Sequence, residues 1–471
     1  MILTFLLFIF SAPVDTNDHI DVELKALASD SKSTPFWMRS LQYGSVPLEN
    51  PGLGTKISLS RTYNPLRRYD WKYGLEVNTW VGSQNTLFLT EAYISGRRGG
   101  WELWAGRKKE VYGLGDTTLT SGFYAWSGNA LPMPKIQLGT PGYLNIFNQW
   151  IGLKMSYAHG YFDNRGPLEN VMLHQKSLYG RIGRPDSRLN LFGGLNHQVQ
   201  WGGNRIVPLT TKRAINVYPS SLNTYFYVVT VLKNKHWVAM DPNTTSDDTD
   251  NQYGNHLGSF DIAAEYKTHW GRVLFYKQTA YEQGAAFNLT PADDGLTGLS
   301  VRLDGQHLIE GVLVEHLYTG NQGLYRSWIA KLFNTVDTHN GEKIEYMYNG
   351  ARSTGWWYQA DEIGTPLIMR DTKTIQGGNQ FTYNAVNVIY LGMRGHITED
   401  FDWVFRGSRS IQTHLRPSRN PVPTFQQQSY SLRVNRIQNE RLTYSFHVSY
   451  DQGEMLAASL GFMVSARYQI K

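Results

Sequence analysis

The sequence predicts an all-β protein, a barrel that crosses a membrane with its strands. The last 16 residues, 456–471, alternate apolar even positions with mostly small or polar odd positions, which is the period of a β-strand. Only 18% of the residues are charged and 13% are aromatic, while the mean hydropathy is −0.40. Few charges, many aromatic residues and a polar average are typical of a barrel with one face in lipid and the other in water.

The same alternation recurs along the chain. In residues 71–81, 151–159 and 442–450, apolar side chains occupy nearly every second position. A membrane strand needs about 9–11 residues, so with its loops the chain suits an antiparallel barrel of about 16–18 strands. Further candidate strands are residues 101–107, 188–195, 260–267, 308–319, 385–393 and 401–407.

Two soluble folds fit less well. A β-sandwich would have shorter strands with more Val and Ile on the buried face. A β-propeller would repeat a blade signature roughly every 40–50 residues, and no such repeat is present in the sequence. The alternation therefore favours the membrane barrel.

The chain divides into three parts. Residues 1–12 are an apolar leader that predicts a signal peptide, although no Lys or Arg precedes it and Phe10-Ser11-Ala12 fits a cleavage site poorly. Residues 13–70 are expected to form an N-terminal segment with a short helix and a first strand or a plug. Residues 71–471 are expected to form the barrel. Beyond the leader, no stretch approaches the roughly 20 apolar residues of a membrane helix.

The stretches without alternation are expected to be loops of two kinds. Residues 240–255 and 287–298 are polar and rich in turn residues, so they predict external loops. Residues 35–52 and 111–148 are instead rich in Gly, Pro and aromatic residues. We expect these two segments to fold inward and to fill the lumen or one mouth of the barrel.

The charge balance suggests an anionic partner. The formal net charge is +6 and the isoelectric point is about 9.1, which favours nucleic acid, an acidic glycan or a lipid head group. The basic residues are scattered and no nucleic-acid-binding motif is present, so nucleic acid is not expected. The sequence has no cysteine, which suits export through an oxidising compartment.

Catalytic and metal-binding signatures are missing from the sequence. It contains no G-x-S-x-G, H-E-x-x-H or GxxxxGK[ST] motif, and its 13 His are dispersed. Asp361 and Glu362 are adjacent, and neighbours on a strand face opposite ways, so they would not share an acid–base site. We therefore expect no enzyme, no cofactor and no metal.

Five segments resemble the capsule-assembly Wzi family of outer-membrane proteins, in the form common in Bacteroidetes: TPFWMRSLQYGSVPL (34–48), AGRKKEVYGLGD (105–116), SGFYAWSGNALPMPKI (121–136), LNHQVQWGG (195–203) and STGWWYQADEIGTPL (353–367). The resemblance implies an 18-stranded barrel with an N-terminal helical segment at the periplasmic side. It also implies a non-enzymatic surface lectin that helps to retain and organise capsular polysaccharide. The N-terminal segment is shorter here than in proteobacterial members, and the chain ends without a terminal Phe or Trp.

Sugar recognition needs aromatic rings for the flat CH faces and polar groups for the hydroxyls, with Arg for uronic carboxylates. Aromatic rings on regular strands are better explained as the interfacial girdle of a barrel. The basic cluster of Arg107, Lys108 and Lys109 fits a rim that faces lipopolysaccharide as well as it fits glycan binding. The candidate glycan-binding residues are Arg107, Lys109, Trp126, His197, Gln200, Trp201, Trp356, Trp357, Tyr358 and Asp361.

The leading functional hypothesis is a monomeric surface lectin of the bacterial outer membrane that binds capsular or other exported polysaccharide. Its other expected partners are outer-membrane lipid and lipopolysaccharide. The alternatives are an anion-selective porin and an outer-membrane hydrolase of glycan or lipid. A porin keeps an open lumen, whereas the lectin reading predicts a lumen closed by inward loops.

Overall fold

The computed structural model describes residues 17–470, apart from 50–51, 83–84, 165–167, 209–212, 233–240, 245–247, 249–252, 283–288, 290, 336–347, 349–354, 371–380, 382 and 414–423. The expected signal peptide and parts of both expected external loops lie outside the described residues. Among the described residues, no helix combines the length and the apolarity that a membrane crossing requires.

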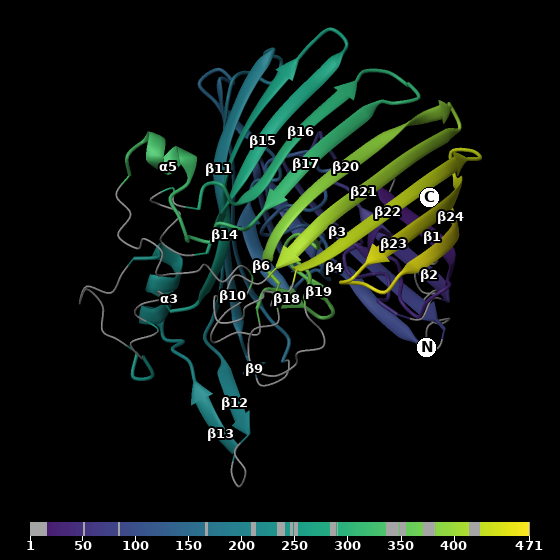
Figure 1. Cartoon of the computed structure of the whole chain (residues 1–471). Coiled ribbons are helices and arrows are strands. Elements are labelled where there is room, and N and C mark those ends of the chain that lie inside the picture. Colours follow the sequence, from purple (N-terminus) through teal and green to yellow (C-terminus); the bar gives the residue numbers. More distant parts are fainter. Residues whose placement is uncertain are drawn as a thin grey trace.

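The wall is a closed antiparallel barrel of 18 strands (Figure 1). Hydrogen bonds between the first and last strands close it, with Asp21 opposite Gln469 and Ser29 opposite Gly461. In order around the barrel, the strands are β1 (Asp18–Ser29), β2 (Leu53–Arg61), β3 (Tyr69–Val81), β4 (Thr86–Arg98), β5 (Trp101–Arg107), β6 (Lys135–Gly139), β8 (Ile151–Tyr161), β10 (Met172–Ile182), β11 (Leu189–Trp201), β14 (Asn255–Lys267), β15 (Gly271–Tyr281), β16 (Gly295–Leu303), β17 (Gly311–Tyr318), β20 (Ala385–Thr398), β21 (Phe401–Thr413), β22 (Thr424–Ile437), β23 (Leu442–Gly453) and β24 (Ser459–Gln469).

Smaller elements lie in the connections between wall strands. The hairpin of β12 and β13 projects away from the wall, and the helices α3 and α5 lie at its side (Figure 1). The bounds are β7 (Leu144–Ile146), β9 (Leu168–Glu169), β12 (Asn204–Pro208), β13 (Arg213–Val217), β18 (Trp357–Tyr358), β19 (Asp361–Glu362), α2 (Phe36–Arg39), α3 (Leu222–Thr230) and α5 (Trp328–Leu332).

Three expected boundaries need correction. The wall begins at Asp18 and not at residue 71, because β1 and β2 both come from the expected N-terminal segment. Within residues 111–148, only the first part is an inward loop, since residues 135–139 form wall strand β6 and residues 144–146 form β7. Residues 295–298, expected to end an external loop, begin β16.

The two ends of the barrel differ in the length of their connections. At the end that carries both termini, β4 is joined to β5 by residues 99–100 and β20 to β21 by residues 399–400. At the other end, residues 30–52, 108–134 and 319–384 join neighbouring strands. Outer-membrane barrels have short periplasmic turns and long extracellular loops, so the long connections lie at the cell surface.

Helix α2 lies in the first long connection, between β1 and β2. The resemblance implied a helical segment at the periplasmic side, and this expectation is wrong for α2. The helix folds into the barrel, where the Nε1 of Trp37 donates to the Oγ of Ser408 on β21 at 3.1 Å. The backbone N–H of Phe36 donates to the Oδ2 of Asp451 on β23 at 2.7 Å.

The wall strands carry apolar side chains outside and polar side chains inside. On β23, Phe446 is 47% exposed while its neighbour His447 is 5% exposed. The same period continues on β24, where Val464 is 50% exposed and faces outward. Tyr444 and Tyr468 near one end, and Tyr430 and Tyr450 near the other, flank this apolar band as an aromatic girdle.

The outward register predicted for the last two strands is confirmed, with one exception. Leu456 was expected to face lipid, but it lies in the turn between β23 and β24 and packs against the buried cluster inside the barrel. The backbone N–H of Leu456 donates to the Oε1 of Gln427 at 3.1 Å, which holds the turn over the lumen.

Introducing an arginine on either face of β24 should show which face meets lipid. Val464→Arg places a guanidinium in the middle of the apolar band, at a cost of roughly 2–4 kcal/mol. Ser465→Arg places the same side chain in the polar lumen, beside Lys25 and Ser445 in the ladder. We expect Val464→Arg to lower the level of heat-resistant barrel in detergent gels, and Ser465→Arg to lower it much less. Equal levels for the two variants would contradict this register.

Three segments fill the interior, and together they are called the plug here: residues 30–49 around α2, residues 108–134 between β5 and β6, and residues 355–370 around β18 and β19. Their aromatic side chains form the main buried cluster, which includes Trp37, Phe123, Tyr124, Trp356 and Tyr358. The segments meet closely. Gly44 has φ +60°, and a Cβ there would lie 2.9 Å from the backbone N of Leu131.

Candidate functional site

The plug is attached to the wall through its backbone. Carboxylates that point inward from the strands accept N–H groups of the plug. Asp261 accepts the N–H of Leu114 at 2.9 Å, and Glu315 accepts the N–H of Ser121 at 2.7 Å. Because polar groups buried without a partner are costly, these contacts allow the irregular plug backbone to be buried inside the barrel.

Inward glutamines satisfy other groups of the plug backbone. The Oε1 of Gln278 on β15 accepts the N–H of Tyr124 at 2.9 Å. The Nε2 of Gln198 on β11 donates to the carbonyl of Ala125 at 2.9 Å. The glutamines at 200 and 412 donate in the same way to the carbonyls of residues 355 and 367, at 3.0 and 3.1 Å. The wall therefore holds all three segments of the plug.

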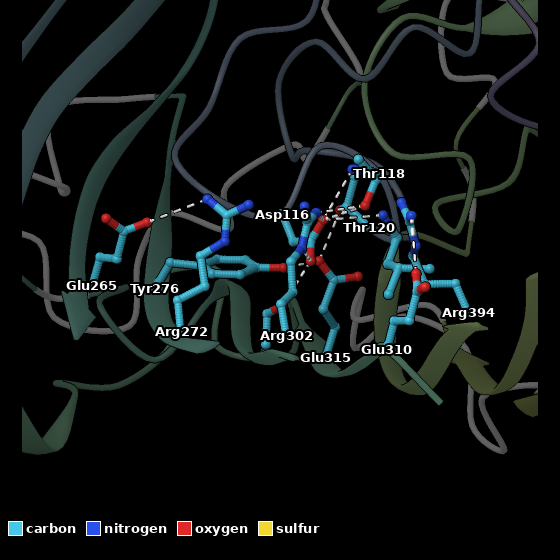
Figure 2. Close-up of polar contacts among 12 residues, drawn as sticks. Asp116, Thr118, Thr120, Glu265, Arg272, Tyr276, Arg302, Glu310, Glu315 and Arg394 are labelled. Carbon is cyan, nitrogen blue, oxygen red and sulfur yellow. Dashed lines mark hydrogen bonds and ion pairs between the residues drawn. The ribbon is translucent and has the colours of Figure 1, made fainter. Parts of the chain in front are cut away.

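Asp116 of the plug forms an ion pair with Arg302 of the wall. Its Oδ2 accepts the Nε of Arg302 at 3.0 Å and the Oγ of Ser300 at 2.6 Å. Burial alone would raise the pKa of Asp116, but the hydrogen bonds from Arg302 and Ser300 lower it to about 2. Figure 2 shows the side chains of Asp116, Arg302 and Glu315 together beneath Thr118 and Thr120. The aspartate is ionised at neutral pH and anchors this part of the plug to β16.

The hairpin of β18 and β19 carries exposed polar groups at the cell-surface mouth. Its tip residues Gln359 and Ala360 are exposed. The hydroxyl of Tyr358 donates to the Oδ1 of Asp163 at 2.6 Å, and the Nη2 of Arg107 donates to that hydroxyl at 3.0 Å. Asp163 follows the cell-surface end of β8, so these contacts place the hairpin at the rim.

Arginines flank this hairpin on two further sides. The guanidinium of Arg370 lies 4.2 Å from the ring centroid of Trp357, which is partly exposed. The Nη1 of Arg39, from the α2 segment, lies 3.5 Å from the Oδ1 of Asp361. Burial raises the pKa of Asp361 to about 7, although the charge of Arg39 acts in the opposite direction. We call this group the mouth cluster: Arg39, Arg107, Asp163, Trp357, Tyr358, Gln359, Asp361 and Arg370.

Four of the ten sequence-predicted site residues come together in the mouth cluster: Arg107, Trp357, Tyr358 and Asp361. Of these, Tyr358 and Asp361 are themselves buried, at 0% and 8% exposure. Three others are buried outside this cluster. Trp356 is 0% exposed, Trp126 is 7% exposed, and Gln200 is buried against the plug backbone. Their side chains are covered by protein in this structure.

The remaining three lie elsewhere. His197 and Trp201 point to the outside of the wall and are buried there. α3 covers Trp201, whose ring lies 5.8 Å from that of Tyr225. The Nε2 of His197 lies 2.9 Å from the Nδ1 of His256. Lys109 lies inside the barrel, where its Nζ forms an ion pair with Glu76 at 2.7 Å.

Sequence reasoning missed Arg39, Asp163 and Arg370. Arg39 stands within the quoted segment 34–48, but nothing in the spacing shows that it meets a hairpin 322 residues later. The inward carboxylates of the wall carried a usable signal, because each occupies a polar position within an alternating strand. Among the described residues, no group of three His, Cys, Asp or Glu converges to hold a metal ion.

A cavity of about 10 Å³, near the volume that one water molecule needs, lies between the plug segments and is lined by Tyr43, Lys108, Glu110 and Trp126 among others. A sugar ring does not fit there. The mouth cluster is the better candidate site, because Trp357, Gln359 and its arginines are at least partly exposed.

No protein-family model and no curated protein sequence matches the chain. Among solved structures, the fold is similar to that of Wzi from Escherichia coli, with a TM-score of 0.60, 14% identity, and coverage of 99% of this chain and 87% of that one. That protein is described as a carbohydrate-binding β-barrel involved in group 1 capsule assembly. OprD of Pseudomonas aeruginosa covers 96% of this chain and 93% of its own at 9% identity, with a TM-score of 0.41. The chain is an outer-membrane β-barrel with the overall fold seen in Wzi.

Proposed function

We propose that the protein is a non-enzymatic surface lectin that binds and organises capsular or another exported polysaccharide. The observation that carries the proposal is a lumen occupied by the plug, with a hairpin flanked by three arginines at the cell-surface mouth. The plug uses the inward polar side chains that an open porin would leave for solute, which speaks against the porin alternative. The similarity to Wzi supports the same reading.

The mouth cluster offers both kinds of contact that an acidic glycan needs. Trp357 supplies an aromatic face, while Gln359 supplies an amide at the exposed tip. Arg370 and Arg107 supply guanidinium groups for carboxylates. Stacking is assigned to Trp357 instead of Trp201 and Trp356, because the rings of the latter two are covered.

Binding of purified capsular polysaccharide to the intact barrel tests this assignment. Trp357→Ala should weaken binding at every salt concentration, because stacking is little affected by ions. Arg370→Gln should weaken it mainly at low salt, because charge attraction is screened beyond about 8 Å at physiological ionic strength. Both variants should keep the folded barrel, whose stability comes from the closed strand ladder.

Trp270→Ala is the matched control. Trp270 is 40% exposed in the short turn between β14 and β15, at the opposite end of the barrel. Its loss should leave glycan binding unchanged. Unchanged glycan binding by the double variant Trp357→Ala/Arg370→Gln, at normal barrel levels, would contradict the assignment of the mouth cluster as the glycan-binding site.

A further inference from the structure

Two neighbouring arginines on the lumen face of the wall differ from several other lumen cations in their ion pairing. Arg406 on β21 and Arg433 on β22 share the inward register of Ser408 and Ser431. Neither arginine forms an ion pair with a described residue. By contrast, four other lumen cations are paired: Lys56 with Glu23, Lys72 with Glu102, Arg302 with Asp116, and Arg394 with Glu310.

The two guanidinium groups lie next to each other and next to a histidine. Arg433 is directly opposite His447 on β23, and Arg406 is opposite Ser431, one diagonal step from Arg433. Directly opposite residues have Cβ atoms about 4.5–5.5 Å apart, and diagonal neighbours about 7–8 Å. His447 faces the same lumen and is 5% exposed. Two cations and an imidazole thus meet on three adjacent strands.

Part of their hydrogen-bonding capacity is unused by the described chain. Within the described chain, the Nε atoms of Arg406 and Arg433 are buried without a partner. Arg406 reaches the carbonyl of Thr118 in the plug with its Nη2 at 3.4 Å. The carboxylate of Asp402 lies on the same face, but its Oδ1 accepts the Nδ2 of Asn435 at 2.6 Å. Two adjacent cations, each with a buried and unpaired Nε, are unfavourable unless an anion completes the site.

We propose that Arg406, Arg433 and His447 form a binding site for an oxyanion, the phosphate or carboxylate group of a ligand that enters from the periplasmic end. The guanidinium fork matches the two oxygens of such a group. The direction of entry follows from the plug. Trp37 of the plug contacts Ser408, two residues nearer the cell surface than Arg406, and Arg433 lies four residues from the short-turn end of β22. This site is separate from the mouth cluster and does not depend on glycan binding there.

Titration of the folded, full-length barrel in detergent with inorganic phosphate, followed by ³¹P NMR, tests the site. A parallel titration with glucuronate measures the carboxylate. Both should raise the unfolding temperature relative to chloride at equal ionic strength. Arg433→Gln should weaken phosphate affinity about tenfold or more, because it removes a charge-assisted contact. A response to only one of the two anions identifies which group the site accepts.

Arg394→Gln is the matched control, because Arg394 faces the same lumen but pairs with Glu310. It should leave phosphate affinity unchanged. In chloride, Arg433→Gln should unfold at the same or a higher temperature, since it relieves repulsion between two cations. The proposal is overturned if neither anion stabilises the barrel more than chloride does, or if Arg433→Gln binds phosphate as tightly as the unmodified chain. A purely structural arginine would instead lower the unfolding temperature in every salt when replaced.

Discussion

Replacing residues 108–134 by a tight turn should convert the closed barrel into an ion channel. Gly106 of β5 is directly opposite Lys135 of β6, so a linker of a few residues can join these strands as an ordinary hairpin. The wall ladder stays complete, while the largest described part of the plug is removed. Planar-bilayer recordings should show stable conductance steps for the shortened barrel and none for the intact protein.

The shortened barrel should still be heat-resistant in detergent, because the closed ladder remains. This control separates an open lumen from a misfolded wall. A folded, shortened barrel without conductance would contradict the assignment of residues 108–134 as the main closure. Large conductance steps from the intact protein would instead favour the porin function.

Glu315→Ala should loosen the plug without opening the wall. The carboxylate of Glu315 is 1% exposed and accepts the hydroxyl of Thr120 at 2.8 Å, the N–H of Ser121 at 2.7 Å and the hydroxyl of Tyr276. Alanine leaves these donors buried without an acceptor, at about 1–3 kcal/mol for each. Hydrogen exchange of the amides around Ser121 should therefore accelerate strongly.

Glu315→Gln is the control for this change, because its amide keeps one acceptor oxygen and nearly the same volume. It should give an intermediate exchange rate. The backbone N–H of Phe36 donates to Asp451 on the other side of the lumen. Its exchange rate should rise less than that of Ser121. Uniform acceleration across the barrel would mean that Glu315 stabilises the wall and not the plug.

Much of the architecture could be predicted from the sequence, because a barrel strand alternates side chains that face lipid with side chains that face the lumen. All the segments expected to be strands lie in the wall, and the outward set on β23 and β24 is confirmed at Phe446 and Val464. The alternation was a weaker guide to strands whose inner face packs against the plug, because inner-face residues there need not be polar. Residues 13–70 were expected to hold a short helix and a first strand or a plug, whereas the structure places two wall strands there, β1 and β2, on either side of the helix.

The inward loops were predicted from their Gly, Pro and aromatic content, and that prediction holds for residues 35–49 and 111–134. What these loops bury was not predictable. Trp126 and Trp356 looked like sugar-stacking residues because they stand beside Gly-rich segments, yet inside a barrel the same rings pack the plug. Composition does not distinguish a ring that faces solvent from one that fills a lumen.

The sequence by itself determined the strand period, the lipid-facing register and the presence of inward segments, because these depend on neighbouring positions along one strand. Only the tertiary structure decided which polar groups meet. Arg39 reaches Asp361, Arg107 reaches Tyr358, and Arg433 forms no ion pair with a described residue, because closure of the barrel sets distances between residues far apart in the chain. The candidate sites depend on those long-range distances, and so they became visible only in the folded barrel.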